Sequence, residues 1–322
     1  MSAVLLRGAA EQGLIYSLVA LALYLSYRTL NIADLTVDGS FTLGAAAGAM
    51  LTSLGHPVLG LFAAAAAGVL AGMVTALLQT ELKVQPILAG IITMTALYSI
   101  NLRVMGNRSN LPLLRVETVY TLFAAALPET LRPWGKFLLS LLITAAVSAS
   151  LFFFLRTRLG LSVRATGDNR TMVSASSINP AFTTTVGLAL ANAMVALSGG
   201  MLAQYQMFSE ITLGTGMVVI GLASLIIGEV IADLFVRSPG VGSAILGAIL
   251  GAVVYRIIIA MALSASVSTS DLKLVSALIV MPWHVLLLKK FTEAFPCKSV
   301  FICGFQYRVR RKSFSSGSLY SL

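Results

Sequence analysis

Long apolar runs follow one another along most of this chain, and they constrain its fold more than any other feature. They cover roughly residues 9–28, 40–55, 57–79, 86–104, 136–155, 181–202, 217–236, 241–263 and 273–289. A helix that crosses a bilayer needs about 20 mostly apolar residues, and backbone in contact with lipid must satisfy its own hydrogen bonds. The alternation typical of membrane barrel strands is absent. The sequence therefore predicts an all-α, polytopic helical membrane protein with about 8–10 transmembrane helices.

Two segments depart from this pattern. The run at 40–55 is short and follows the polar segment NIADLTVDGS, so we expect a broken or partly re-entrant helix there. The apolar piece from Thr118 to Leu127 is too short to span a bilayer. We expect it to lie re-entrant in an outer loop.

The composition excludes several classes of function. The chain is 57% hydrophobic and 11% charged, whereas soluble domains carry about 25% charged residues. The loops leave no room for a soluble catalytic domain of about 100 residues. No GxxxxGK[ST] loop, HExxH motif or cluster of Cys and His ligands occurs in the sequence. The sequence predicts a protein that is not an enzyme, has no metal site and holds no cofactor of its own.

The net charge of +10 does not indicate a nucleic-acid partner. Much of the excess lies from Lys289 onward, and the other basic residues stand at the ends of apolar runs, where they set the topology. A surface that follows a phosphate backbone needs basic residues interleaved with aromatic ones on a soluble face. We therefore expect the bilayer, and no nucleic acid, as the surroundings of this chain.

The basic residues also predict an orientation. If the arginine-rich loop 156–180 lies in the cytoplasm, four ends of apolar runs lie on the same side. These are the ends near Arg28, Lys83, Arg237 and Lys289. The loops 104–135, 203–216 and 264–272 and the N-terminus then lie outside. Arg108, Arg115 and Arg132 in an outer loop count against this arrangement, and one helix more or fewer in the first 60 residues would reverse the N-terminus.

Glycines recur at the spacing of close helix packing. The pairs are Gly44 and Gly48, Gly68 and Gly72, and Gly247 and Gly251. Small residues four apart let two helix backbones approach each other. These pairs predict helix contacts rather than a substrate site.

Charged residues within the predicted spans are few. Ion-coupled transporters keep acids within the membrane, and the middle of these runs holds none. Asp34 and Asp38 stand at the start of the second run, where a watery vestibule or a helix N-terminus would suit them; a solvated inner loop is the alternative. Arg256 lies well inside a run and must face protein or water.

The segment 156–180, RTRLGLSVRATGDNRTMVSASSINP, is a polar island in this apolar chain. It carries Arg156, Arg158, Arg164 and Arg170 against one acid, Asp168. Its small and polar residues suit a surface helix, with Asp168 or Asn169 able to cap the N-terminus. The arginines could pair with acids of a partner; an ordinary solvated basic loop is the alternative.

The same island resembles the cytoplasmic loop of permeases of the branched-chain amino acid and ribose ABC importer family. The matching positions are Gly160, Arg164, Ala165, Gly167, Asp168, Asn169, Met172, Ile178 and Asn179. Ser177 stands where the family has a glycine. The stretches Leu30–Ala47, Ala189–Phe208 and Gly214–Ile231 also resemble the family. Within the family, the resemblance is closest to the subgroup paired with tryptophan/tyrosine-type binding lipoproteins. Two stretches carry it, ADLTVDGSF and GMVVIGLASLIIGE.

The resemblance implies a transmembrane subunit of an ATP-driven importer in the bacterial cytoplasmic membrane, moving a small polar nutrient such as an amino acid. Two permease copies, identical or related, would form the pore. An extracytoplasmic binding protein would deliver the substrate. Separate ABC ATPase subunits, which hold ATP and magnesium, would receive a short coupling helix from each loop 156–180.

Two sites and two domains follow as expectations. The residues that match in the loop 156–180 would couple to the ATPase, and Asp34, Asp38, Ser40 and Phe41 would line the translocation path. Residues 1–290 would form the permease domain. The basic tail at 291–322 does not look like the family's usual ending, which suggests an altered reading frame or a replaced terminus. The competing interpretations are an ion-coupled secondary transporter without an ATPase partner and a membrane scaffold that transports nothing.

Overall fold

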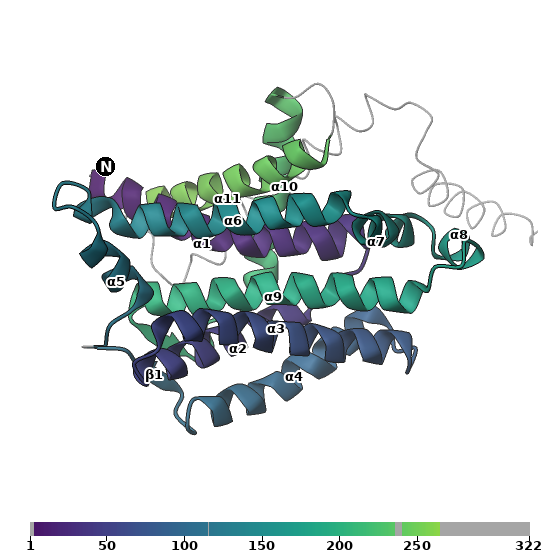
Figure 1. Cartoon of the computed structure of the whole chain (residues 1–322), viewed down its shortest axis with the longest axis horizontal. Helices are drawn as coiled ribbons and strands as arrows, with labels where there is room; N and C mark the ends of the chain where they lie inside the picture. Colours follow the sequence, from purple (N-terminus) through teal and green to yellow (C-terminus); the bar gives the residue numbers. More distant parts are fainter. Residues whose placement is uncertain (1–2, 115, 236–239, 265–322) are drawn as a thin grey trace, which may run out of the picture. The chain divides into compact units, whose positions relative to one another are not determined.

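The computed structural model describes residues 3–114, 116–235 and 240–264. Within these ranges the chain is a bundle of helices with one small β-ribbon (Figure 1). The elements are α1 (Ala3–Leu23), the π-helix η1 (Tyr24–Thr29), α2 (Thr36–Ser53), α3 (Pro57–Thr80), α4 (Pro86–Val104), β1 (Asn110–Pro112), α5 (Val119–Ala126), the 3-10 helix η2 (Arg132–Trp134), α6 (Gly135–Arg156), α7 (Arg158–Asp168), α8 (Arg170–Ala175), α9 (Pro180–Gln206), β2 (Phe208–Glu210), α10 (Met217–Phe235) and α11 (Val241–Ser264).

The all-α prediction is confirmed. Each apolar run before residue 264 forms a helix, while the run at 273–289 and the tail 291–322 lie outside the described residues. In the described part, 6 helices are long and apolar enough to cross a membrane: Leu5–Thr29, Pro57–Thr80, Pro86–Val104, Arg132–Arg156, Pro180–Gln206 and Val241–Ser264. A shorter apolar helix covers Met217–Ala232.

The second run is not a broken helix. Helix α2 continues from Thr36 to Ser53 without interruption. The break precedes it, in the non-helical segment between Thr29 and Thr36. There the Asp34 side chain accepts a hydrogen bond at 2.9 Å from the N–H of Thr36, the first residue of the helix. The piece around Thr118 forms α5, and its Thr118 and Thr121 side chains make a capping box.

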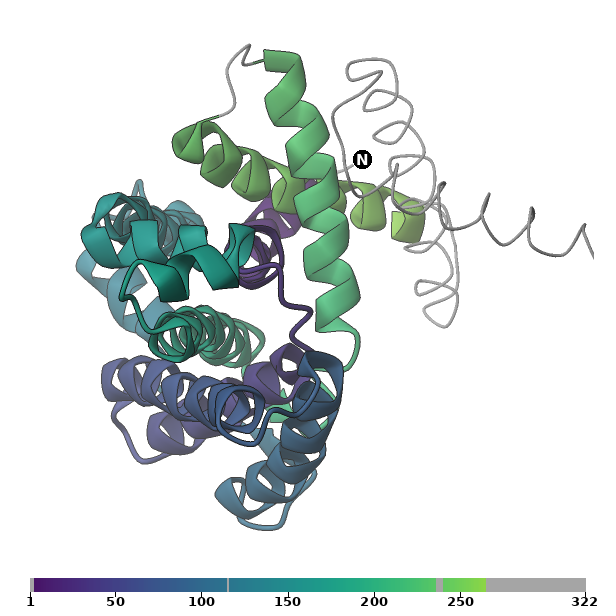
Figure 2. The same cartoon turned by 90° about the vertical axis from the view of Figure 1, so that its right-hand side faces the viewer.

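Helix α9 is the centre of the bundle and packs against α1, α2 and α3. It lies between α1 and α6 on one side and α2 and α3 on the other (Figure 1). Figure 2 looks along most of these helices and shows α10 from the side, so α10 crosses them steeply.

The glycine pairs make the close helix contacts that their spacing predicts. A Cβ at Gly44 would collide with the Ala196 carbonyl oxygen, and one at Gly68 would collide with that of Asn192. A Cβ at Gly251 would collide with the Ser224 carbonyl oxygen of α10. Glycine therefore brings α2, α3 and α11 into backbone contact with their neighbours.

Arg256 faces protein, as expected of a cation within an apolar run. Its Nη2 donates to Gln12 Oε1 at 2.7 Å, and its guanidinium lies 4.2 Å from the centre of the Tyr16 ring. These two contacts join α11 to α1 and replace part of the hydration that the guanidinium loses.

Opposite ends of the bundle carry the two sets of loops that the topology prediction separates. At one end, β1 pairs antiparallel with β2, with Asn110 opposite Glu210. This ribbon joins the loops 104–135 and 203–216, which were expected on the same side. Helices α7 and α8 lie at the other end (Figure 1). There the side chains of Lys83 and Arg170 line one pocket, so the 81–85 turn and the loop 156–180 also share a side.

Candidate coupling surface and translocation path

Helix α7 is fixed to the bundle by two glycines of the polar island. Thr157 caps the helix by accepting a hydrogen bond from the Gly160 N–H at 3.2 Å. A Cβ at Gly160 would collide with the Phe154 carbonyl oxygen of α6, and one at Gly167 with the Thr29 carbonyl oxygen of η1. Both glycines therefore allow close backbone packing, which holds α7 against the ends of α6 and η1.

Helix α8 is short, and its first turn is held by Asn169. The Asn169 Oδ1 accepts hydrogen bonds from the Thr171 and Met172 N–H groups, both at 3.1 Å. Of the two residues that the sequence offers as the cap, the structure uses Asn169 rather than Asp168. Val173 is buried, whereas the Met172 side chain is 68% exposed. The helix thus rests on one apolar residue and presents an apolar side chain outward.

The turn that follows α8 explains the glycine that the family has at position 177. Ser177 has φ of 60°, in the left-handed region that favours glycine. Asn179 then caps α9 by accepting from the Ala181 N–H at 2.9 Å, with Pro180 in the first helical position. Ile178 between them is half-buried. Serine fits this turn at some cost in backbone strain.

The charged residues of the island face outward. Arg164, Ala165, Asp168 and Arg170 are all exposed. Behind them the Thr166 and Thr183 hydroxyls lie 2.7 Å apart and tie α7 to α9. The sequence-predicted coupling residues therefore divide into glycines and caps that build a rigid frame and side chains that the frame presents.

The predicted translocation residues lie at the junction of α2 with α9 and α10, and most of them are enclosed. Asp34 is 2% exposed, and its Oδ2 accepts from Asn192 Nδ2 at 2.7 Å. The Ser40 hydroxyl donates to Asn192 Oδ1 at 2.6 Å. Phe41 is fully buried and stacks on Tyr16 with ring centroids 6.2 Å apart. In this conformation these three residues contact protein rather than an open path.

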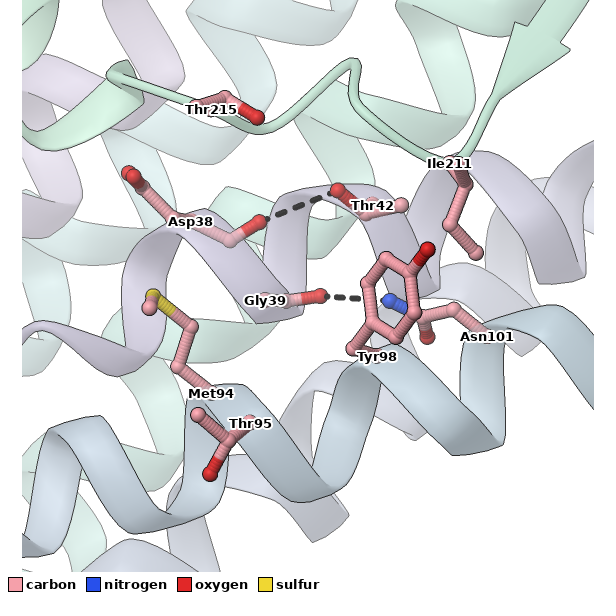
Figure 3. Close-up of a pocket in the computed structure, with 9 residues that line it drawn as sticks. All are labelled: Asp38, Gly39, Thr42, Met94, Thr95, Tyr98, Asn101, Ile211 and Thr215. Carbon is pink, nitrogen blue, oxygen red and sulfur yellow. Dashed lines mark hydrogen bonds between the residues drawn. The ribbon is translucent and has the colours of Figure 1, made fainter. Parts of the chain in front are cut away.

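Asp38 has a different environment. Its Oδ2 accepts from the Gly216 N–H at 2.9 Å and its Oδ1 from the Val218 N–H at 3.0 Å. The carboxylate of α2 thereby caps the N-terminus of α10, one of the two environments expected for it. Asp38 also lines a pocket of about 320 Å³ together with Tyr98 and Asn101 of α4 (Figure 3).

One residue of this region, Asn192, was not singled out from the sequence. Asn192 carries no motif, although a fully buried amide in the central helix is the partner of both Asp34 and Ser40. An asparagine within an apolar run is the signal that could have identified Asn192, because a buried amide needs polar partners.

Known proteins resemble the chain over most of its length. The family model described as "Branched-chain amino acid transport system / permease component" matches residues 5–282. A tyrosine transport system permease protein of Clostridioides difficile (strain R20291) is 34% identical over 270 residues, which are 84% of this chain and 86% of that protein. The uncharacterized protein RP368 of Rickettsia prowazekii (strain Madrid E) is 33% identical over 221 residues, 69% of this chain and 75% of that one.

Among solved structures, PsaBC from Streptococcus pneumoniae in complex with Fab aligns with a TM-score of 0.49 and 16% identity, covering 87% of this chain and 89% of that one. The family match and the C. difficile relative each cover most of the sequence. They agree with the apolar helices of the structure. The chain belongs to the branched-chain amino acid transport system permease family and is a multi-pass transport subunit of the cell membrane, not an enzyme.

Proposed function

We propose that this chain is the membrane subunit of an ATP-driven ABC importer for an amino acid. A separate ATPase would bind and hydrolyse ATP, an extracytoplasmic protein would deliver the substrate, and two permease copies would surround the path. The similarity to a tyrosine transport system permease supports an amino-acid substrate.

The presentation of α8 is the observation that supports coupling to an ATPase. Asn169 and Asn179 cap the helices on either side of a tight turn, and the Thr166–Thr183 contact ties α7 to α9. A movement of α8 would therefore be transmitted to α9, the central helix, because a tight turn and not a long loop connects the two helices. Exposed Met172 and Arg170 supply an apolar and a cationic contact for the partner.

The proposal is tested by purifying the tagged full-length permease in mild detergent and identifying co-purifying proteins by mass spectrometry. We expect an ABC ATPase subunit with the unaltered chain. The variants Arg164→Glu and Arg170→Glu should reduce its recovery at least about tenfold, since about 1.4 kcal/mol of lost interface energy changes an affinity tenfold. The variant Arg108→Glu is the matched control, because Arg108 is exposed near β1, at the other end of the bundle.

Equal recovery of the ATPase with all three variants would contradict the coupling assignment. Recovery of the permease alone in several detergents would contradict the ATP-driven importer itself.

The buried position of the Asp34 carboxylate is the one observation that favours the ion-coupled alternative. The sequence indicates no acid in the middle of a span, yet the structure places this carboxylate against Asn192, near the midpoint of α9. Acids at such depth mark ion paths in many transporters. Uptake of an amino acid by liposomes that hold the permease alone and a proton gradient would support ion coupling over the ATP-driven reading.

A further inference from the structure

We propose that a pocket at the end of the bundle that carries α7 and α8 binds a phosphate group, and that this group belongs to the headgroup of an anionic phospholipid. The pocket has a volume of about 450 Å³. The end of α3, the 81–85 turn and the start of α4 form one side of it, and the starts of α8 and α9 form the other. The inference does not depend on the ATPase of the proposed function, because a multi-pass protein contacts lipid whatever drives its transport.

The charges in this pocket favour an anion. Lys83 and Arg170 are the charged residues that line it, and both are cations. Both residues are exposed, and neither forms an ion pair within the described part of the chain. Glu81 and Asp168 precede them by two positions but do not line the pocket. The fold therefore brings two positive charges from distant parts of the chain into one cavity, and a cavity with charges of one sign attracts the opposite ion.

Lys83 occupies a backbone position that suits glycine better than lysine. Its φ is 52°, in the left-handed region. The Val84 N–H donates to the Leu78 carbonyl oxygen at 3.1 Å, so Lys83 is the left-handed residue of the turn that closes α3. Glycine would fit this turn with less strain. Replacing Lys83 by glycine therefore removes the cation and leaves the turn intact.

The backbone at the start of α4 adds to the positive potential of the two cations. Helix α4 begins at Pro86, which lines the pocket, and Gln85 before it makes no side-chain cap. The first N–H groups of a helix have no partner inside the helix and carry partial positive charge. Helix α9 begins at the same pocket with Pro180, but Asn179 already caps it. An anion beside Lys83 would thus lie near one uncapped helix start.

The apolar surface next to the pocket indicates a lipid as the source of the phosphate. Helix α3 has 24 residues and is about 36 Å long, so its ends reach past a hydrocarbon core of about 30 Å to the headgroups. Leu77 lies one turn before Thr80, which lines the pocket, and about half of its surface is exposed. Ile87 and Leu88 of α4 are equally exposed. Acyl chains would lie against these side chains, whereas a free phosphate would leave them uncovered. Basic pockets between cytoplasmic ends of membrane helices bind anionic headgroups.

A bound headgroup would also restrain the coupling surface. Arg170 is the first residue of α8, and Lys83 belongs to the turn between α3 and α4. A phosphate that contacts both would join α8 to this turn. We therefore expect added phosphatidylglycerol to slow hydrogen exchange at residues 170–175.

The site is tested by titrating the purified full-length permease in detergent with dioctanoyl-phosphatidylglycerol and measuring bound lipid by native mass spectrometry. Lys83→Gly and Arg170→Ala should each raise the Kd about fivefold, which corresponds to about 1 kcal/mol for a basic residue beside an anionic lipid. Lys83→Arg keeps the charge and should bind like the unaltered chain. Arg158→Ala is the matched control, because Arg158 is an exposed cation of the same loop that does not line the pocket.

Three further measurements identify the ligand and exclude misfolding. Dioctanoyl-phosphatidylcholine has the same phosphate but no net charge, so it should bind more weakly than phosphatidylglycerol. Inorganic phosphate should compete poorly, because it makes no contact with the apolar surface. Lys83→Gly should unfold at the same temperature as the unaltered chain or a higher one, since glycine suits the turn.

Each contrary result overturns a defined part of the inference. Unchanged lipid binding in Lys83→Gly and Arg170→Ala, or an equal loss in Arg158→Ala, overturns the pocket as the site. Strong competition by inorganic phosphate that Lys83→Gly abolishes overturns the lipid source. Lower recovery of a co-purifying protein with Lys83→Gly, at unchanged lipid binding, overturns the lipid site and assigns the pocket to an acidic group of that protein.

Discussion

At the scale of single residues, Asn192 of α9 links two buried polar side chains, those of Asp34 and Ser40. Its amide donates to Asp34 and accepts from Ser40, and all three residues are buried. We expect Asn192→Leu to lower the free energy of unfolding by about 3 kcal/mol, because it leaves a buried carboxylate oxygen without a donor. Denaturation of the purified protein in detergent measures this loss. Asp34→Asn combined with Asn192→Leu should lose less than Asn192→Leu alone, since an unpaired amide costs less than an unpaired carboxylate; an equal or larger loss would contradict the shared bond.

At the scale of elements, α8 is too short to be stable by its own hydrogen bonds and depends on its cap. Asn169→Ala should cost about 1 kcal/mol of local stability. We expect faster hydrogen exchange at residues 170–175, measured by mass spectrometry, with the unfolding midpoint of the whole protein unchanged. Asn169→Asp keeps an acceptor in the same place and is the control. Unchanged exchange in Asn169→Ala would show that contacts other than the cap hold α8.

The elements also show what sequence reasoning can and cannot reach. Each apolar run before residue 264 correctly predicted a helix, and the glycine pairs predicted close contacts, since both properties are local in the sequence. Neither property says which helices meet. The Asp38 carboxylate caps α10, which begins at Met217 far along the chain, and Asn101 reaches the pocket beside Asp38 only through the packing of α4 on α2. The sequence therefore offers a helix N-terminus as one of several environments for Asp38, but it does not indicate that the helix is α10.

At the scale of the whole molecule, the pairing of distant loops makes the topology testable. Because β1 pairs with β2, residues 109 and 212 must lie on one side of the membrane. Ser174 in α8 lies at the other end of the bundle (Figure 1). In a chain with Cys297→Ser and Cys303→Ser, we expect an impermeant thiol reagent to label Ser109→Cys and Thr212→Cys in intact cells. Ser174→Cys should react only after permeabilisation, since basic loops remain in the cytoplasm. Labelling of Ser174→Cys alone in intact cells would reverse the orientation and leave the fold intact. Labelling of Ser109→Cys and Thr212→Cys from different sides would contradict the β-ribbon, and with it the arrangement that brings α2, α4 and α10 together around Asp38.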